Sequence, residues 1–315
     1  MKVYYNINDF KPVKSAIVTV GTFDGVHLGH QAIFRRMTAD AREIGGETVV
    51  ITFHPHPRQV LHIDSSNLRF ITTQEKKMEI FKQTGIDNVV VIEFTKEFSR
   101  TASEIFIKDY IVDKIKPARL VVGYDHHFGK NRMGDFKLLF DLGQRYHFKV
   151  ERIAALDVEN IAVSSTKIRK ALENGDVKKA NMLLGYEYTV CGEVVHGNEL
   201  GRKLGFPTAN LNIPENFKVI GVSGVYACHV IYQGVKYNGM GNIGFRPTVS
   251  GNSELTTEVH IFDFDQTIYG QQVCISFVEK IREEVKFASL DELKQQLATD
   301  RITATKLLNS LSEHI

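Results

Sequence analysis

The sequence predicts an α/β protein of two domains: a doubly wound parallel sheet, followed by an antiparallel β-barrel with a terminal helix. Three observations support this prediction. The chain has 315 residues, more than one ordinary hydrophobic core organises. Apolar strands alternate with helical segments in the first half, as they do in parallel sheets. After Gly185 the segments become short, β-rich and bounded by turns, which is typical of a barrel. We place the domains at residues 1–184 and 185–315.

Four predicted strands in the first half are rich in β-branched residues and almost continuously apolar, as strands buried on both faces are. They are Ala16–Val20, Val49–Phe53, Val89–Phe94 and Leu120–Gly123. The helical patterns between and after them are Gln74–Thr84, Ala102–Lys114 and Ser165–Asn174, and the short segment Asp176–Leu184 precedes the expected domain boundary. In such sheets ligands bind beyond the carboxyl ends of the strands, so the residues that follow each strand are the candidates for function.

The second half contains strand-like segments separated by turn signals. The segments are Tyr188–Gly197, Gly224–Tyr232 and Gln272–Val278, and hairpin-like breaks occur at Gln233-Gly234 and Asn238-Gly239. In the tail, Ser289 and Glu292 have the spacing of a capping box, which predicts the start of a helix.

The composition limits the classes of partner. Lys and Arg number 39 and Asp and Glu 37, so a net charge of +2 gives no global support for binding to nucleic acid or to an acidic membrane. No secretory signal and no membrane-spanning run is evident, and we expect a cytoplasmic protein. Cys191, Cys228 and Cys274 fit no metal-binding spacing, and each is predicted to be a small buried apolar residue.

The segment Gly21–His30 carries the strongest functional signal. It joins a buried strand to a helix through a glycine-rich turn and places two histidines three residues apart. Backbone N–H groups and the positive end of the helix dipole then face the same point, which favours a bound phosphate. The candidate residues are Gly21, Phe23, Asp24, His27, Gly29 and His30. The alternatives are two solvent-facing histidines or a pair of metal ligands.

Two further segments follow predicted strands or begin predicted helices. In Gly123–Gly129, Asp125 could bind a ribose or an incoming substrate, and His127 and Phe128 could stack on a planar ring, although a plain polar loop fits equally well. In Ser164–Arg169, hydroxyl groups and two cations occupy the first turn of a helix, where the dipole disfavours cations unless an anion is bound. Ser164, Ser165, Thr166 and Arg169 are therefore candidates for holding a triphosphate.

Together these segments resemble the bacterial bifunctional riboflavin kinase and FMN adenylyltransferase family. The amino half resembles the adenylyltransferase module through Gly21–His30, Phe53–Pro57, Gly123–Gly129 and Ser164–Arg169. The carboxyl half resembles the riboflavin kinase module through Gly201–Asn210, Gly224–Ala227, Asn242–Thr248 and Glu258–Phe264. Within it, the string Gly205-Phe206-Pro207-Thr208-Ala209-Asn210 is unusually specific. The motifs cover nearly the whole chain in the family's order.

The resemblance implies two ATP-dependent reactions, riboflavin to FMN and FMN to FAD, with Mg²⁺ as the metal. In the amino half it implies that His27 and His30 stabilise the phosphates, that Ser164–Arg169 hold the leaving pyrophosphate, and that Asp125, His127 and Phe128 contact flavin or adenosine. In the carboxyl half it implies that Glu258 is the catalytic base and that Thr208 and Asn210 hold the metal and phosphates. Gly201, Lys203 and Gly205 would form a basic loop over the nucleotide, and Arg282 would contact flavin.

The sequence differs from the family pattern at two places, and two other functions are alternative hypotheses. His126 stands where an aromatic residue often follows the acidic position. In the turn after Phe262-Asp263-Phe264, where the family tends to show an acidic residue and glycine, the sequence is Asp265-Gln266-Thr267-Ile268-Tyr269-Gly270. A nucleotidyltransferase of another specificity, for example for pantetheine phosphate, explains only the amino half. A flavin-binding regulator would be expected to have lost phosphate-contacting residues, which are all present. The sequence makes no prediction of oligomeric state.

Overall fold

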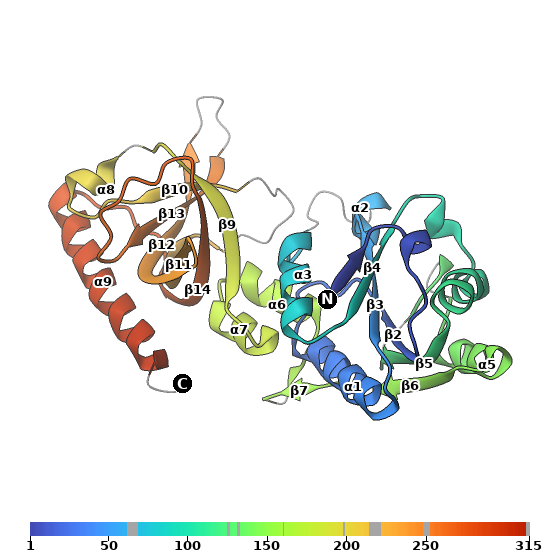
Figure 1. Ribbon diagram of the computed structural model, residues 1–315. Coiled ribbons are helices and arrows are strands. Elements are labelled where there is room, and N and C mark those ends of the chain that lie inside the picture. The colour runs from blue at the N-terminus through green and yellow to red at the C-terminus, as the bar shows by residue number, and fades with distance from the viewer. Residues whose placement is uncertain are drawn as a thin grey trace. The chain divides into compact units, whose positions relative to one another are not determined.

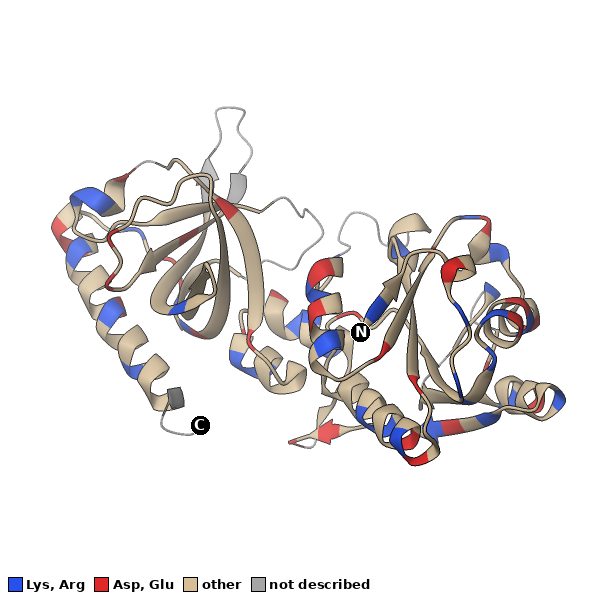
Figure 2. Cartoon of the chain, in the orientation of Figure 1, with Lys and Arg blue, Asp and Glu red and all other residues tan. Residues whose placement is uncertain are grey.

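The computed structural model describes residues 1–61, 69–124, 127–130, 133–159, 161–197, 199–213, 222–247 and 253–312. The chain forms two compact units, Met1–Ser165 and Thr166–Ile315 (Figure 1). The first unit is an α/β sheet domain and the second is a β-barrel with helices, as the sequence predicts. Basic and acidic residues are interspersed along the long helices α1 (Leu28–Ile44) and α9 (Leu290–Ser312), in keeping with the nearly balanced charge (Figure 2).

The first unit is built on a six-stranded sheet in the order β1-β4-β3-β2-β5-β6. Every neighbouring pair of strands in it is parallel. The strands are β1 (Lys2–Tyr4), β2 (Ala16–Val20), β3 (Thr48–His54), β4 (Asn88–Glu93), β5 (Pro117–Gly123) and β6 (Lys149–Ile153). The four predicted strands are β2 to β5, and the two strands at the edges were not predicted. A short pair, β7 (Asp157–Val158) and β8 (Ile161–Ala162), completes the strands of this unit.

Helices connect these strands, and their apolar spacing explains why they form. In α1, residues Ile33, Phe34, Met37 and Ala41 recur at helical spacing and are buried, so one face packs on the sheet. Gly45 ends the helix in the left-handed conformation (φ 61°). The other helical segments are η1 (Ile7–Asp9), α2 (Pro57–Val60), α3 (Gln74–Gln83), η2 (Phe98–Arg100), α4 (Ser103–Ile105), the π-helical η3 (Phe106–Ile115) and α5 (Phe136–Tyr146).

The second unit contains a closed antiparallel barrel in the order β10-β13-β12-β11-β14-β9. Its strands are β9 (Tyr188–Val195), β10 (Ala209–Asn212), β11 (Gly224–Tyr232), β12 (Val235–Pro247), β13 (Ser253–Ile261) and β14 (Gln272–Arg282). Inside it, the rings of Tyr226 and Phe277 meet edge to face, 5.4 Å apart, next to the buried Cys228. The barrel prediction is confirmed.

Helices cover part of the outer surface of the barrel. Helix α9 packs on β11, β12 and β14, and its buried residues Ala304 and Leu308 contact Phe262. Ser289 caps the helix by accepting a hydrogen bond from the Glu292 N–H at 3.2 Å, as its spacing predicts. Helices α6 (Ser165–Glu173) and α7 (Val177–Leu184) fall almost wholly in this unit, and α7 packs on β14 and β9. The remaining helix is α8 (Leu200–Lys203).

The turn signals of the second half gave one correct prediction and one wrong one. Gln233 and Gly234, with φ 49° and 79°, form the hairpin turn between β11 and β12. Asn238 and Gly239 instead lie within β12. A Cβ at Gly239 would be 2.8 Å from the His260 carbonyl oxygen, so this glycine permits close approach of two strands rather than a turn.

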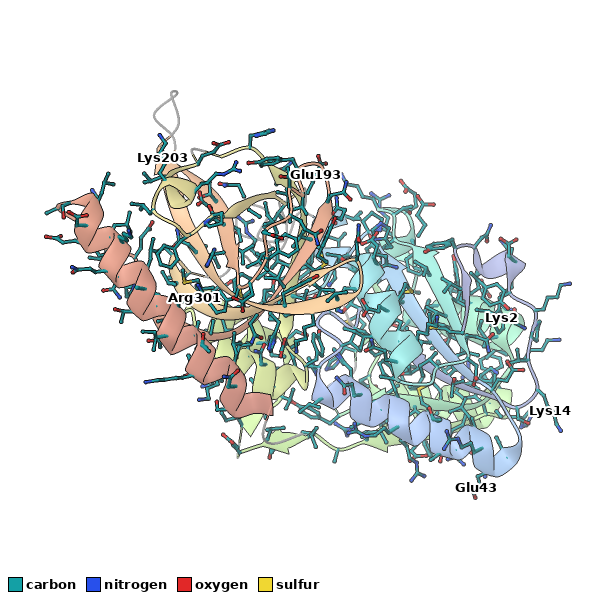
Figure 3. All side chains as sticks on the ribbon, turned by 60° about the vertical axis from the view of Figure 1, so that its left-hand side comes forward. Lys2, Lys14, Glu43, Glu193, Lys203 and Arg301 are labelled. Carbon is teal, nitrogen blue, oxygen red and sulfur yellow. A yellow bond between two sulfur atoms is a disulfide. The ribbon has the colours of Figure 1, made fainter. Side chains whose placement is uncertain are left out.

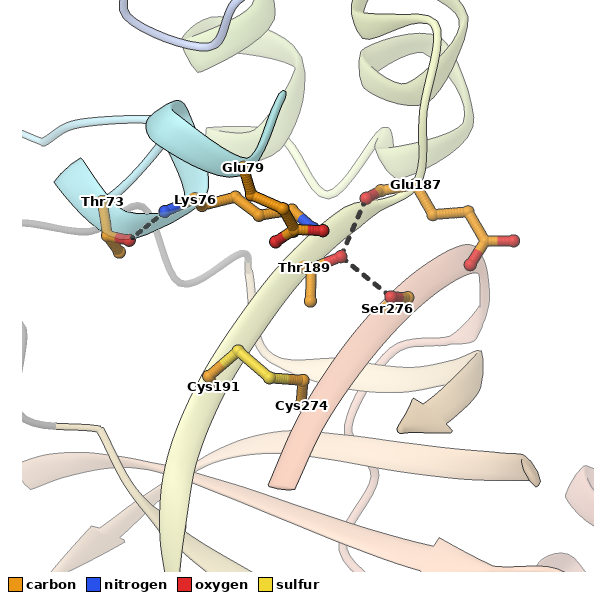
Figure 4. Close-up of a disulfide and its surroundings, with 8 residues drawn as sticks. All are labelled: Thr73, Lys76, Glu79, Glu187, Thr189, Cys191, Cys274 and Ser276. Carbon is orange, nitrogen blue, oxygen red and sulfur yellow. Dashed lines mark hydrogen bonds and ion pairs between the residues drawn. A yellow bond between two sulfur atoms is a disulfide. The ribbon is translucent and has the colours of Figure 1, made fainter. Parts of the chain in front are cut away.

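The prediction for the cysteines was correct for one of the three. Cys228 is buried and unbonded, and its burial raises the pKa of the thiol. Cys191 and Cys274 lie directly opposite each other on β9 and β14 and form a disulfide, with Cα atoms 4.0 Å apart (Figure 4). The Cys191 residue is exposed rather than buried. The two cysteines are 83 residues apart in the sequence, and only the pairing register of the strands brings them together. Cysteine spacing alone therefore could not predict the disulfide.

Candidate active sites

The turn between β2 and α1 has an unusual backbone. Phe23, Gly25 and Val26 all have positive φ, at 49°, 82° and 35°. Glycine adopts such angles easily, but for a β-branched residue such as Val26 they are strained. Strained residues persist where the surrounding contacts hold them, and they concentrate at functional sites. Val26 is fully buried, so the turn is held in this shape from within.

Asp24 fastens this turn to the rest of the first unit. Its Oδ1 atom accepts hydrogen bonds from the backbone N–H groups of Ile71 (3.0 Å) and Thr72 (3.2 Å). The Thr72 hydroxyl oxygen in turn accepts from the Gly25 N–H at 3.0 Å. The Ser165 hydroxyl donates to the Asp24 carbonyl oxygen at 2.8 Å, which brings the start of α6 to the turn. The structure thus gives Asp24, 3% exposed, a scaffolding role.

The two histidines of the turn lie against each other. Their rings stack with centroids 3.6 Å apart and planes 16° apart. His27 is the N-cap of α1, and its Nδ1 atom accepts the His30 N–H at 3.4 Å. Because Nδ1 is an acceptor, the neutral ring carries its proton on Nε2, which can donate to a ligand. Gly29 packs on this ring: a Cβ there would be 3.2 Å from Nδ1 of His27.

His30 lies in an environment that keeps its ring neutral. Burial lowers the pKa of His30 well below its ordinary 6.5, and the charges of His27 and Lys77 lower it further. Its Nδ1 atom is buried without a hydrogen-bond partner among the described residues. Phe23, 4% exposed, meets the His30 ring edge to face at 5.1 Å and packs on Phe34 behind it. Phe23 therefore supports His30 from the core.

Lys77 is a charged residue of this region that the sequence analysis missed. It lies on α3, is only 5% exposed, and shares the buried face of that helix with Ile80 and Phe81. Burial lowers the pKa of Lys77, and the negative charge of Asp24 opposes that shift. A lysine on the apolar face of a helix is the signal that could have revealed it.

The remaining candidates of the first half lie in several different places. Asp125 lies outside the described residues. His127 is exposed, whereas Phe128 is 7% exposed and packs in the core against Phe106 at 6.4 Å. The N–H of Gly21 donates to the Ile51 carbonyl oxygen at 3.0 Å, which ties the start of the turn to β3. Ser164 directly precedes α6, and Thr166 and Arg169 lie on that helix in the second unit.

On the barrel, a row of polar residues crosses three neighbouring strands. Asn210 on β10 and Asn242 on β12 are both directly opposite Glu258 on β13. Opposed residues of adjacent strands project to the same face, so these three side chains share one face. Thr208, just before β10, places its Oγ1 atom 3.4 Å from Oε2 of Glu258. The structure therefore joins the predicted Thr208, Asn210 and Glu258, and adds Asn242.

Glycines bring the backbone close to this row. A Cβ at Gly197 would be 2.2 Å from Nδ2 of Asn210, so the absence of a side chain lets the backbone just after β9 lie close to that amide. Gly201, on α8, closes a tight loop: its carbonyl oxygen accepts hydrogen bonds from the N–H groups of Leu204 at 3.1 Å and Phe206 at 2.8 Å. Gly205 adopts φ 87°, which a glycine takes without strain. Lys203, labelled in Figure 3, is exposed on the same short helix.

Arg282, at the end of β14, is held by α9. Its Nε and Nη2 atoms both donate to the Asp300 carboxylate, at 3.0 Å and 2.7 Å. Asp300 is 1% exposed, so this bidentate pair is largely shielded from water. The guanidinium also lies over the Phe287 ring, 5.6 Å from its centroid. The structure thus shows Arg282 fixed in orientation by the terminal helix.

The donor set on the barrel fits a hard cation. The Thr208 hydroxyl, the Asn210 amide and the Glu258 carboxylate present oxygen atoms, which Mg²⁺ prefers, while it takes few protein ligands and keeps several waters. Among the described residues, no three His, Cys, Asp or Glu side chains form a metal-binding group. Within the same residues, every helix is too short or too polar to cross a membrane.

A parallel-sheet domain with a phosphate-suited turn, joined to a barrel with an oxygen-lined row, defines a two-module transferase of phosphorus-containing groups. Family models agree: residues 10–167 match FAD synthetase and residues 184–308 match riboflavin kinase. The chain belongs to the bifunctional riboflavin kinase/FMN adenylyltransferase family. The barrel half has the riboflavin kinase activity and the sheet half the FMN adenylyltransferase activity, and together they make FAD.

Individual relatives extend over nearly the whole chain. The bifunctional riboflavin kinase/FMN adenylyltransferase of Haemophilus influenzae is 38% identical over 304 residues, covering 96% of this chain and 97% of that protein. That of Pseudomonas fluorescens is 34% identical over 315 residues and covers both chains fully. A crystal structure of a Streptococcus pneumoniae protein described as a macrolide-efflux protein matches with a TM-score of 0.87 and 32% identity, covering 96% of this chain and 98% of that one.

Proposed function

We propose that adenylyl transfer takes place at the β2–α1 turn, with ATP as the nucleotide. A phosphate oxygen of FMN attacks the α-phosphorus of ATP, the bond to the β-phosphate oxygen breaks, and pyrophosphate leaves. His27 donates from Nε2 to the phosphates, and the N-terminus of α1 adds backbone N–H groups. The stacked histidines at 3.6 Å and the buried, unsatisfied Nδ1 of His30 support this assignment, because a phosphate oxygen could accept a hydrogen bond there.

Phosphoryl transfer, in our proposal, takes place at the row on the barrel. The ribityl 5′-hydroxyl of riboflavin attacks the γ-phosphorus of ATP, Glu258 accepts the hydroxyl proton, and ADP leaves. The observation that carries this assignment is the register that sets Asn210 opposite Glu258, with Thr208 at 3.4 Å from its carboxylate. Thr208 and Asn210 would hold Mg²⁺, which supplies charge neutralisation for the phosphates when bound.

We also assign the helices that join the two modules. The family models end at residue 167 and begin at residue 184, so the intervening residues belong to neither. We propose that residues 1–184 make up the adenylyltransferase part of the chain, although α6 and α7 form a compact unit with the barrel. The bond between Ser165 and Asp24 supports a shared role for the turn and the start of α6.

The experiment that tests these assignments measures both reactions in single-residue variants. FMN formation is followed from riboflavin, and FAD formation is followed separately with FMN supplied. Glu258→Gln should lower the kinase rate by about 10²- to 10⁴-fold, the contribution of a general base, and leave FAD formation unchanged. His27→Ala should lower FAD formation by about 10²- to 10³-fold, the cost of losing one oriented donor, and leave FMN formation unchanged.

Each variant serves as the folding control for the other, because the two reactions belong to different modules. A kinase rate near wild type in Glu258→Gln removes that residue as the base. Equal loss of both reactions in a folded His27→Ala protein contradicts separate sites.

A further inference from the structure

His260 is a buried histidine of the barrel to which neither reaction assigns a role. It lies on β13, two residues after Glu258, so both side chains project from the same face of the strand. It is 6% exposed, and its Nδ1 atom is 2.8 Å from the Pro207 carbonyl oxygen. A carbonyl oxygen only accepts, so Nδ1 carries the proton and donates it. Burial lowers the pKa of His260, in keeping with a neutral ring.

The hydrogen bond between His260 and Pro207 lies just before the first backbone pair of β10 and β13. Backbone pairing between β10 and β13 starts with Ala209 opposite Val259, so Pro207 and Thr208 precede it. Proline has no N–H group, and its carbonyl oxygen is the only backbone atom by which it can be tethered. The hydrogen bond from His260 therefore ties this segment to β13 at Pro207, the residue immediately before Thr208.

Aromatic neighbours fix the orientation of the His260 ring. The Phe206 ring lies edge to face with the His260 ring at 5.5 Å, and the Phe262 ring lies at 5.6 Å with its plane tilted by 57°. Phe262 belongs to the buried cluster that includes Ala304 and Leu308 of α9, and Phe206 packs against that cluster. The imidazole thus contacts two packed aromatic rings, one of which belongs to the segment that carries Thr208.

We propose that His260 is a positioning residue of the kinase module, which holds the Pro207 carbonyl and thereby sets Thr208 against Glu258. The inference rests on the roles proposed above for Thr208 and Glu258. Its consequence is specific: what matters is a donor at the position of Nδ1, not bulk or polarity at residue 260. Because His260 touches neither substrate nor metal in this assignment, its loss should act on turnover through Thr208.

The first test compares two amide replacements of similar chemistry in the full-length protein. The short Asn side chain can place its N–H near the position of Nδ1, whereas the longer Gln side chain places it near that of Nε2. We expect His260→Asn to keep the kinase kcat within about fivefold of wild type and His260→Gln to lose about 10²-fold, the cost of misplacing a reacting group by about 1 Å. The KM for riboflavin should change little in both. Equal kcat values in the two variants would overturn the proposal.

The second test asks whether His260 acts through Thr208. In a Thr208→Ala background, His260→Gln should cost almost nothing further in kcat, since the group it positions is gone. If the fold-losses in kcat of the two single variants multiply in the double variant, the two residues act independently and the proposal is contradicted. Because Glu258→Gln probes the base on its own, failure of that assignment is distinguishable from failure of this one.

A matched control is available in the same barrel. His229 on β11 is 7% exposed, and its Nδ1 atom lies 2.9 Å from Oε2 of Glu187, away from the polar row. His229→Gln should lower the unfolding temperature while leaving the kinase kcat unchanged. The adenylyltransferase rate of each preparation should equal that of wild type. A loss of kinase turnover in His229→Gln as large as in His260→Gln would show that any damaged buried histidine produces it, and would overturn the proposal.

Discussion

His27 and His30 come from one strand, turn and helix of the first unit, whereas Thr208 and Glu258 of the barrel are 50 residues apart and meet through strand pairing. The first pair is stacked and capped within its own segment. The arrangement of Thr208 and Glu258 depends on the register of β10 against β13, and their neighbour Asn210 lies close to the Gly197 backbone. A site built locally should withstand disturbance of the surrounding fold better than one assembled from distant strands. The following predictions test that difference.

The largest expected effect is on the stability of the barrel. The disulfide between Cys191 and Cys274 closes a long loop, and such cross-links typically stabilise by about 2–4 kcal/mol, so reduction should lower the free energy of unfolding of the second unit by that amount. All three cysteines of the chain lie in that half, so the first unit should be unaffected. Denaturant unfolding with and without a dithiol reductant measures this.

Two variants separate the disulfide from other effects of the reductant. In Cys191→Ser/Cys274→Ser the reductant should shift nothing, whereas in Cys228→Ala its effect should persist in full. A shift that survives in the double variant contradicts the assignment to this pair.

The second prediction concerns Gly197. A methyl group there would meet the Asn210 amide at 2.2 Å and displace it, so Gly197→Ala should lower the kinase rate by about 10²-fold, the cost of misplacing a reacting group by about 1 Å. Gly241→Ala is the matched control, because its Cβ would find ordinary contacts of 3.5 Å or more. If both variants keep wild-type FMN formation, the close approach at Gly197 has no catalytic importance.

The corresponding glycine of the first site should matter less. A Cβ at Gly29 would be 3.2 Å from the His27 ring, a contact that a shift of a few tenths of an ångström relieves. Gly29→Ala should therefore slow FAD formation only about fivefold, equivalent to about 1 kcal/mol in the barrier. Initial rates with saturating FMN and ATP measure this. A loss greater than that in the kinase of Gly197→Ala would reverse the ranking of the two sites.

The smallest expected effect is a dependence of stability on pH in the first unit. Because the pKa of folded His30 lies well below 6.5, the unfolded chain binds a proton there at a pH where the folded chain does not. The stabilisation is present above pH 6.5 and is lost gradually as the pH falls below it. Unfolding of His30→Gln should therefore depend less on pH between 7 and 5 than that of wild type, and equal pH dependence in the two proteins would contradict this prediction.

Sequence reasoning succeeded where local pattern determines structure. Ala16–Val20 was predicted with its observed bounds, because buried parallel strands consist of unbroken β-branched residues. The edge strand Lys149–Ile153 was missed, since three of its five residues are charged, which is not the pattern of a buried strand. Short Lys2–Tyr4 likewise offers too few residues for a pattern.

The parts of the sites that were missed depend on register and burial, which no local pattern contains. Asn242 joins the polar row only because β12 pairs with β13 in one register. Lys77 approaches the histidine turn because α3 is buried against it, and the disulfide exists because β9 and β14 align Cys191 with Cys274. In contrast, the stacked histidines follow from a helical start that the sequence displays directly.

Strand β13 also constrains how this chain can change in length. Its outward residues Glu258 and His260 alternate with the inward Thr257, Val259 and Ile261. Each of these three inward residues is at most 5% exposed. Inserting or deleting one residue at the start of the strand would exchange the two sets. A carboxylate and an imidazole would enter the barrel interior, while valine and isoleucine would take the outward positions. Changes in length are therefore expected outside this strand rather than within it.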